Sequence, residues 1–550
     1  MMTTTTQRPS AHGPADRTPR EALAGTGTLI VMILRRERVK LPAWLLGSTA
    51  LLLFFALVVL PELAAAEKGL QDLRRLMEGG VGSVFGPGYG RDAITEERYL
   101  TGVYGLFFFI LAALMSLQLV ARHTRLEEQH GRVELIRASV LGRHAQLTAT
   151  LVVAVAANLV LGLLLAAGMV AAGHGAGGAL LFGAGVAAVG LVFTGITTLT
   201  VQVTEHSRTA TGLAGAILGA AWAIRAAGDL IEDHGSPLSW LSPLAWSNQT
   251  RPYVDGRWWP LLLSLGLAVL TAAAGYALSA RRDVGAGLLP PRPGAGAAAP
   301  WLSSPLAVVF RLQRAGLIWW TVALGGFGLV FGGLADQMAD PTDMSESRLE
   351  MFGGSTDTLV DGYLAMITVV TAAVAGVMVV LGVLSAQSEE TKGRAEPLLA
   401  TATGRVTWLG SYVAVTAAGL MGLLLVVGLA TGAGAALTTG DGSYVGEMTG
   451  AFLAHAPGAL VLLGLTALLV GVLPRLAGVM WLVLGYNFFA GVVAQIADLP
   501  QGARAISPLE HTGQPPLESV SWPTLLVLLA IAVTLTFVGL AGFRRRDLEA

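Results

Sequence analysis

Cysteine is absent from the 550-residue sequence, which excludes disulfide bonds, thiolate metal sites and cysteine nucleophiles. Charged residues make up only 13% of the chain, against about a quarter in a typical soluble domain. Lysine occurs three times, and the net charge of −1 gives no concentrated basic surface for nucleic acid. With 53% hydrophobic residues and a mean hydropathy of +0.64, the composition predicts a protein that resides mostly in lipid.

Runs of apolar residues long enough to cross a bilayer, about 20 residues each, occur twelve times. We therefore predict an all-α integral membrane protein with twelve transmembrane helices. Six spans are predicted in the first half, at 41–61, 100–121, 146–172, 178–203, 209–231 and 259–280, and six in the second, at 316–335, 359–385, 407–437, 450–473, 478–497 and 522–542.

The arginines predict the orientation of these spans. Twelve spans place both termini on one side, and the short loops on that side hold most of the arginines, which the positive-inside rule assigns to the cytoplasm. The long first outer loop, 62–99, also carries bases, but long loops follow the rule less strictly. We expect both termini to be cytoplasmic. The arginines on that side are Arg122, Arg125, Arg132, Arg137, Arg143, Arg208, Arg281, Arg282, Arg311, Arg314, Arg544, Arg545 and Arg546.

The stretch 127–143, which follows the second span, recurs as 389–405 after the eighth, and every matching position is 262 residues apart. Nearby, Ser242-Pro243-Leu244 recurs as Ser507-Pro508-Leu509, and Arg282-Asp283 as Arg546-Asp547. The chain is therefore predicted to be two parallel six-helix repeats. Glu127, Glu128, Gly131, Arg132, Glu134, Gly142 and Arg143 match Glu389, Glu390, Gly393, Arg394, Glu396, Gly404 and Arg405.

This duplication predicts four segments. They are a disordered cytoplasmic tail, a first transmembrane half, a linker rich in Pro, Gly and Ala, and a second half, at 1–28, 29–282, 283–305 and 306–550. Each half opens with an apolar and then basic segment, at 29–40 and 306–314. That pattern fits a helix lying in the membrane interface, and equally a plain basic flank of the first span.

Charges and glycines in the repeated loop match in both halves, while most of the surrounding apolar residues differ. We interpret the two loops as docking surfaces that a partner outside the membrane contacts. The paired glutamates are expected to be surface residues, and the glycines to end a helix or to allow close approach of the backbone. The alternative is that the charges only keep the loops in the cytoplasm.

The six-span halves and the repeated E-E-x-x-G-R-x-E…G-R loop resemble the permeases of type-2 ABC exporters. The closest likeness is to the fused two-half form, described as actinobacterial polyketide-antibiotic or tetronasin-resistance exporters. The resemblance implies that 127–143 and 389–405 are coupling helices, each docking on a nucleotide-binding ATPase subunit. It also implies hydrophobic drugs or antibiotics as substrates, and the plasma membrane of a bacterium as the location. The bias toward arginine and glycine agrees with an actinobacterial source.

No phosphate-binding loop of the GxxxxGK[ST] type occurs. The chain is therefore predicted not to be an enzyme and to hold no cofactor, with ATP and Mg²⁺ bound by the partner subunits. Two docking loops imply two such subunits, either two copies or a heteropair.

Polar, aromatic and methionine side chains within the spans are candidates for a substrate pathway. Arg225 and Asp229 stand one helical turn apart and are able to pair, or else they lie near the outer end and reach water. The remaining candidates, for which lipid contact or ordinary packing is the alternative, are Phe107, Phe108, Phe109, Met115, Trp222, Met366, Met480, Trp481, Tyr486, Asn487 and Phe488.

Two other functions stay open. A proton-coupled secondary multidrug antiporter requires more buried charge than the spans contain. A non-transporting membrane partner of an ATPase would be expected to have large outer domains. No metal site is predicted, because His123, Glu127 and His130 match no zinc spacing, and the acidic loop with Asp336, Asp340 and Asp343 is what topology alone predicts.

Overall fold

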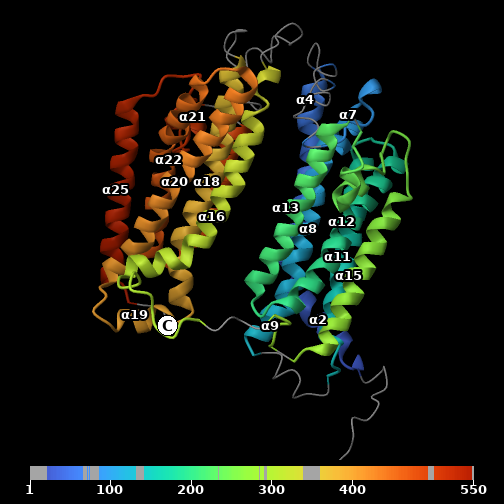
Figure 1. Ribbon diagram of the computed structural model, residues 1–550, viewed down its shortest axis with the longest axis horizontal. Helices are drawn as coiled ribbons and strands as arrows, with labels where there is room; N and C mark the ends of the chain where they lie inside the picture. Colours follow the sequence, from blue (N-terminus) through green and yellow to red (C-terminus); the bar gives the residue numbers. More distant parts are fainter. Residues whose placement is uncertain are drawn as a thin grey trace, which may run out of the picture. The chain divides into compact units, whose positions relative to one another are not determined.

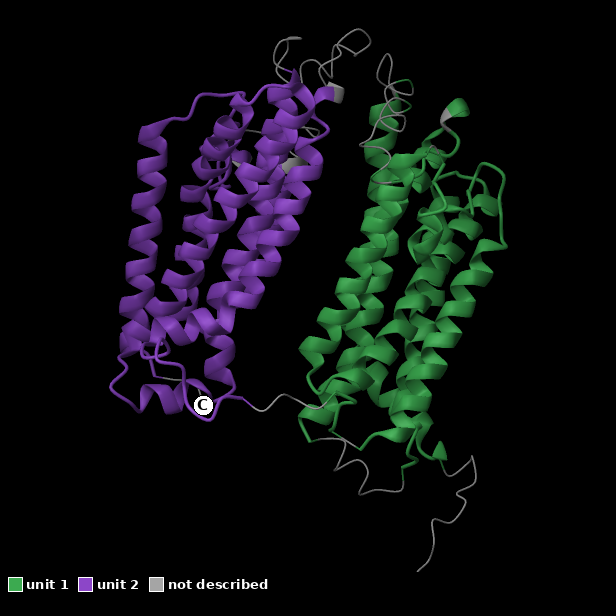
Figure 2. Cartoon of the chain, in the orientation of Figure 1, with its two compact units in different colours: residues 1–293 green, residues 294–550 purple. Residues whose placement is uncertain are grey.

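The computed structural model (Figure 1) describes residues 22–65, 71, 74, 84, 86–131, 141–232, 234–283, 285–289, 294–338, 359–493 and 501–547. The regular structure in these ranges is entirely helical, which confirms the all-α prediction. The chain divides into two compact units, residues 1–293 and 294–550 (Figure 2). Each unit is described separately below.

Eleven helices in the described part of the chain are long and apolar enough to cross a membrane, and they coincide with eleven of the twelve predicted spans. Of the predicted span 478–497, the structure describes α23 (Met480–Phe488) and η8 (Phe489–Val493), while 494–497 lie outside the described residues. The span 478–497, the eleventh in chain order, therefore stays a prediction.

In the first unit, a short helix α2 (Thr26–Arg36) precedes six spans. They are α3–η1–α4 (Lys40–Phe54, Phe55–Val59, Leu60–Ala65), α7–η3–α8–α9 (Glu96–Tyr99, Leu100–Tyr104, Gly105–His123, Arg125–Gln129), α11 (Ala145–Ala171), α12 (Ala176–Val203), α13 (Ser207–Ile231) and α15 (Pro260–Arg281), with η2 (Arg91–Ala93), η4 (Ser239–Leu241) and α14 (Pro243–Asn248) in the loops.

The second unit contains five spans and the partly described α23. The spans are α16 (Pro305–Gly332), α18 (Leu359–Thr391), α20 (Arg405–Thr439), α21–α22 (Ser443–Ala454, Ala456–Val472) and α25 (Trp522–Arg545), with η5 (Ala335–Met338), α19 (Ala395–Leu399), η7 (Pro474–Val479), α24 (Gln501–Arg504) and η9 (Glu510–Thr512) between them.

The two units differ at their first helix. In the first unit α2 ends before Glu37, and α3 begins at Lys40 with Pro42 in its first turn, where a proline lacks the N–H that would continue the preceding helix. In the second unit α16 runs unbroken from Pro305 to Gly332. The segment 306–314 is therefore the start of a span and not a separate interfacial helix.

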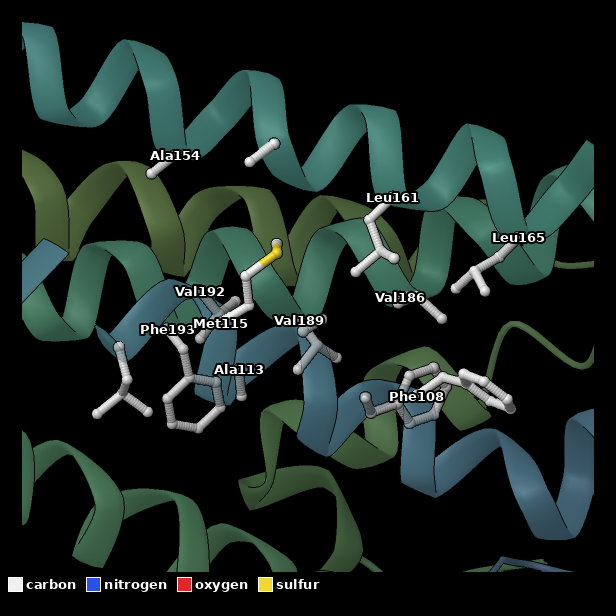
Figure 3. Packing of buried hydrophobic residues seen from close by; sticks show 14 of the residues in the cluster. Phe108, Ala113, Met115, Ala154, Leu161, Leu165, Val186, Val189, Val192 and Phe193 are labelled. Atoms are coloured by element: carbon white, nitrogen blue, oxygen red, sulfur yellow. The ribbon is translucent and has the colours of Figure 1, made fainter. Parts of the chain in front are cut away.

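Helix α12 forms the centre of the first unit, since 83% of its most apolar window is buried. It packs against α8, α11, α13 and α15. Figure 3 shows Phe108 and Met115 of α8 close to Val189 of α12, with Leu161 of α11 beside them. In the second unit α22 packs against α18 and α25 in the same way as α12 packs against α8 and α15.

Helices α11 and α12 approach each other through two glycines. A Cβ built on Gly183 would lie 2.2 Å from the carbonyl oxygen of Gly162, and a Cβ on Gly162 would lie 2.4 Å from that of Gly183. Small residues at such crossings let two backbones approach closely, which in lipid is a main source of attraction between helices.

The variant Gly183→Ala is expected to unfold at a lower temperature than the wild type, because the added methyl group forces α11 and α12 apart at a cost of about 1–3 kcal/mol. Thermal unfolding in detergent measures this. The matched control is Gly219→Ala on α13, where a Cβ meets nothing within 4 Å. Equal unfolding temperatures for both variants would contradict the close packing.

Candidate functional site

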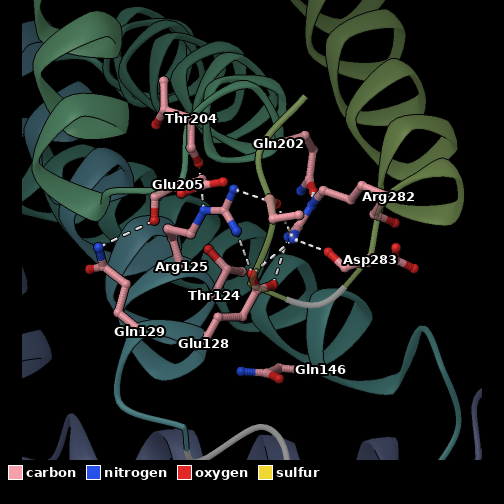
Figure 4. Close-up of polar contacts among 12 residues, drawn as sticks. Thr124, Arg125, Glu128, Gln129, Gln146, Gln202, Thr204, Glu205, Arg282 and Asp283 are labelled. Atoms are coloured by element: carbon pink, nitrogen blue, oxygen red, sulfur yellow. Dashed lines mark hydrogen bonds and ion pairs between the residues drawn. The ribbon is translucent and has the colours of Figure 1, made fainter. Parts of the chain in front are cut away.

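The first repeated loop is tied to the end of the sixth span by its second glutamate (Figure 4). Arg282, which follows α15, donates from Nη2 to Glu128 Oε1 at 2.6 Å and from Nη1 to Glu128 Oε2 at 2.9 Å. Arg125 Nη1 donates to the same Oε2 at 2.6 Å. Bidentate arginine–carboxylate pairs are among the strongest side-chain hydrogen bonds, so α9 is fixed to the end of α15.

The two arginines also bind the end of α12. Arg125 Nε donates to the carbonyl oxygen of Thr204 at 2.6 Å, and Arg282 Nε donates to Gln202 Oε1 at 2.5 Å. Arg125 Nη2 reaches the carbonyl oxygen of Ala286 at 2.9 Å. The second, fourth and sixth spans of this unit therefore end in one polar cluster, which includes the repeated loop.

The second unit has the same anchor. Arg546, which follows α25, donates from Nη2 to Glu390 Oε2 at 2.7 Å. The last arginine of each loop binds a carbonyl at the end of the last helix of its unit, α15 or α25, as well: Arg143 donates to Ala280 and Arg405 donates to Arg546. The second glutamate and the last arginine of each loop thus contact the end of the last helix of their own unit.

The glycines of the loop end helices, which is one of the two roles expected of them. Gly131 follows α9 and Gly393 follows α18, and each has φ of +67°, a left-handed conformation that favours glycine. Gly404 is the N-cap of α20. The loop therefore turns sharply at the same place in both units.

The expectation that the paired glutamates lie on the surface is wrong for two of them. Glu127 is 4% exposed and forms an ion pair with Arg36, whose Nη1 lies 3.0 Å from Glu127 Oε2, and Glu390 is 6% exposed. The arginines that cover them come from distant parts of the chain, so the loop sequence alone gave no sign of burial. Glu389 is more accessible and pairs within its loop with Arg394 Nη2 at 2.6 Å.

The exposed part of the second loop is the short helix α19. Glu396 and Leu398 are exposed on it, and the preceding Arg394 side chain is 54% exposed. Figure 1 places α19 at the same end of its unit as the C-terminus. The matching positions in the first loop, Arg132 and Glu134, lie outside the described residues.

A further ion-pair cluster, which sequence reasoning missed, joins the first helix of unit one to the second span. Glu37 accepts from Arg122 Nη1 at 2.6 Å and lies 2.8 Å from His123 Nε2. Burial raises the pKa of Glu37, but the hydrogen bonds from His123 and Arg122 outweigh this and lower it to about 2.

The second unit has neutral residues where the first has Glu37 and His123. Arg35, Glu37 and Arg38 are matched by Arg311, Gln313 and Arg314, each 276 residues later. Gln313 Nε2 donates to Ser385 Oγ at 3.2 Å, and Ser385 stands 262 residues after His123. This correspondence between the two first helices was the signal in the sequence that would have pointed to Glu37.

The pair Arg225–Asp229 is buried, so the interpretation that both residues reach water at the outer end is wrong. Arg225 Nη1 donates to Asp229 Oδ2 at 2.9 Å, and Ser239 Oγ donates to Asp229 Oδ1 at 2.8 Å. Arg225 also donates to the carbonyl oxygen of Val84. These contacts join α13 to two loops, and a role in transport stays a prediction.

The other predicted pathway residues do not converge on one cavity within either unit. Buried in the cores are Phe108, Phe109, Met115, Met480 and Asn487; Trp222, Met366 and Tyr486 are half-buried; and Phe107, Trp481 and Phe488 are exposed. Asn487 lines a pocket with Arg504, Glu510 and Glu518.

The repeated Ser-Pro-Leu motif joins a loop to a helix in each unit, to α13 in the first and to α23 in the second. Ser242 Oγ donates to the carbonyl oxygen of Ala221 at 2.7 Å, and Ser507 Oγ donates to Asn487 Oδ1 at 2.7 Å. Five residues after each serine, Ser247 binds the Gly185 carbonyl, and Thr512 lies 2.6 Å from Nδ1 of the buried His455. In the described ranges no group of three metal-ligating side chains occurs.

The variant Glu390→Arg is expected to lower the unfolding temperature, because breaking a buried ion pair costs about 3–5 kcal/mol. Adding Arg546→Glu restores an opposite pair and should recover part of the loss. Adding Arg545→Glu, at the exposed neighbouring arginine, should not. Equal recovery by both second substitutions would argue against a specific pair, and thermal unfolding in detergent distinguishes the cases.

The Glu37 cluster predicts a pH dependence. Because the folded-state pKa of Glu37 lies below its ordinary value of 4.5, its contribution to stability is present above about pH 4.5 and is lost as the pH falls toward 2. The difference in unfolding temperature between wild type and Glu37→Gln should therefore be largest near pH 7 and shrink between pH 4.5 and 3. A difference that does not change with pH would contradict the assignment.

Comparison with known proteins gives the family. The family model described as multidrug efflux system permease Rv1217c, C-terminal domain, matches residues 27–278 and 302–544. The multidrug efflux system permease protein Rv1217c of Mycobacterium tuberculosis is 36% identical over 555 residues, covering 98% of each chain. With eleven candidate spans in the described residues, the chain is a multi-pass membrane protein. It belongs to the family of the multidrug efflux system permease Rv1217c.

Proposed function

We propose that the chain is the membrane-spanning subunit of an ATP-driven exporter of the type-2 ABC class, which moves hydrophobic drugs or antibiotics out of the cell. It would span the membrane twelve times as two parallel six-helix repeats with both termini in the cytoplasm. Two findings support this proposal. The family model matches two stretches of similar length, and the relative Rv1217c is named a multidrug efflux system permease.

The observation that carries the proposal is the twofold anchor of the repeated loop. In each unit the second glutamate of the loop pairs with the arginine after the sixth span, Glu128 with Arg282 and Glu390 with Arg546. A loop held this firmly transmits force from a partner directly to the ends of the spans. Two nucleotide-binding subunits, identical or a heteropair, would push on 127–143 and 389–405 as they bind and hydrolyse ATP with Mg²⁺.

Docking itself would fall to the exposed residues of the loops, because the buried glutamates are occupied by the anchor. Glu396 and Leu398 on α19 offer one exposed carboxylate and one exposed apolar side chain. A small charged and apolar surface of this kind suits a groove on a soluble partner.

The exporter proposal is tested by purifying the tagged chain in detergent with the ATPase encoded beside its gene and measuring ATP turnover with and without drugs. One chain with two ATPase subunits and drug-altered turnover is the expected result. If no ATPase binds and drug movement in proteoliposomes follows an imposed pH gradient, the antiporter alternative replaces it.

The variant Glu396→Lys should weaken ATPase binding roughly tenfold, because reversing one charge in an interface costs about 1.4 kcal/mol. Its unfolding temperature should not change, since the side chain is exposed. The control is Glu232→Lys, which reverses the charge of an exposed acid just after the C-terminal end of α13. The loop that joins α12 to α13 is at the other end of this helix. Binding constants from the purified components decide, and an equal effect of both variants would remove α19 from the docking surface.

A further inference from the structure

The second unit contains a pocket next to its repeated loop, and Leu398 of α19 forms part of its wall. Val308 and Leu312 of α16 and Trp408 of α20 provide apolar walls. Glu389, Arg394 and Thr403 provide polar ones. The pocket lies at the N-terminal end of α16, a helix long and apolar enough to cross a membrane.

In the first unit the residues around the equivalent space contact one another directly. Arg36 of α2 pairs with Glu127 of the loop at 3.0 Å. The side chain of Leu141 packs so closely on Gly25 that a Cβ there would lie 1.9 Å from Leu141 Cδ2. The backbone N–H of Gly142 donates to the carbonyl oxygen of Ala24 at 3.0 Å. The first helix and the loop are therefore joined directly.

Two residue differences open this space in the second unit. Leu312 stands where the first unit has Arg36, 276 residues earlier, and Thr403 stands where it has Leu141, 262 residues earlier. Without a counterpart of Arg36, Glu389 pairs with Arg394 inside the loop at 2.6 Å. Without a counterpart of Leu141, the apolar walls at Val308 and Trp408 face a pocket.

The chemistry around the pocket favours an amphipathic ligand with a negative headgroup. Arg394, whose side chain is 54% exposed, makes a single hydrogen bond within the described residues and keeps further N–H donors for an anion. Arg311 and Arg314 are exposed on the same turns of α16 as Leu312. Arg394 and Glu389 are the charged residues of the pocket lining, and Arg311 and Arg314 lie outside that lining on the same stretch of α16. Basic residues at the membrane ends of helices attract anionic lipids.

We propose that this pocket binds an anionic membrane lipid, with an acyl chain against Val308, Leu312 and Trp408 and the phosphate at Arg394. The lipid takes the place that Arg36 and Leu141 occupy in the first unit. It thereby joins α16 to the repeated loop, so that both loops are supported from their first helix. This binding does not rest on the proposed ATPase partner and is testable on the chain alone.

The test compares lipid binding by the purified full chain and a variant that carries the residues of the first unit, Leu312→Arg with Thr403→Leu. Because both side chains already occur in this setting in the first unit, the variant is expected to fold, and its unfolding temperature verifies this. The matched control is Leu306→Arg, which adds the same charge at an exposed position of α16 that does not line the pocket.

The probe is a photoactivatable phosphatidylglycerol, and phosphatidylcholine, which carries no net charge, is the competitor. Cross-linked peptides are mapped by mass spectrometry. Labelling of peptides that contain Val308 or Trp408 is expected in the wild type and the control, with at least a fivefold loss in the filled variant. Arg394→Gln should remove the preference for phosphatidylglycerol over phosphatidylcholine.

Equal labelling of wild type and filled variant would overturn the proposal. Loss of ATPase binding in a filled variant whose lipid labelling is unchanged would also overturn it, because the pocket would then belong to the partner. The filled variant could lose its labelling while phosphatidylglycerol and phosphatidylcholine compete equally well for the wild-type pocket. In that case the anionic headgroup assignment is wrong.

Discussion

Backbone N–H and C=O groups inside a bilayer have no water to bond, so every spanning segment must satisfy them within itself. This constraint makes the chain a set of long helices and moves almost all of its charge to their ends. Charges concentrated at helix ends, near the border of the lipid, pair with one another. The ion pairs Glu128–Arg282 and Glu390–Arg546 follow from that arrangement, and they hold the repeated loop of each unit against the end of its last helix, α15 or α25.

The same constraint explains how the helices pack. Lipid gives no hydrophobic reward for bringing two apolar helices together, so close backbone contact and buried hydrogen bonds hold the units together. Gly162 and Gly183 supply such a contact between α11 and α12. Asn158 of α11 supplies the other kind, donating to Ser116 Oγ of α8 at 2.8 Å. The central position of α12 is a consequence of many such contacts along one helix.

The two units use one plan with different chemistry. The first helix of the first unit is held by charge, through Glu37 with Arg122 and His123 and through Arg36 with Glu127. The second unit uses the neutral Gln313 with Ser385 at the first of these points and leaves a pocket at the other. The two units therefore share an anchor for the loop but differ in how their first helix is supported.

The loop that was interpreted as a surface for docking also contains an anchor, while docking itself stays a prediction. Its matching charges and glycines were visible in the sequence, and the glycines at 131 and 393 turn the chain as their type predicts. Which glutamates are buried was not visible, because Arg36, Arg282 and Arg546 reach them from elsewhere in the chain. The predicted pathway residues stay a prediction for a related reason. A span rich in aromatics has the same composition whether it faces lipid, a neighbouring helix or a cavity.

The sequence by itself determined the all-helical membrane class, eleven helices in the described residues and the presence of the repeated loop. These features depend on composition, on the length of apolar runs and on spacing along the chain, all of which are local. Only the tertiary structure decided that Arg225 and Asp229 are buried, that Glu37 is paired, and that a pocket lies beside the second loop. Each of these results depends on side chains separated by many residues, whose contacts are set by how the helices pack.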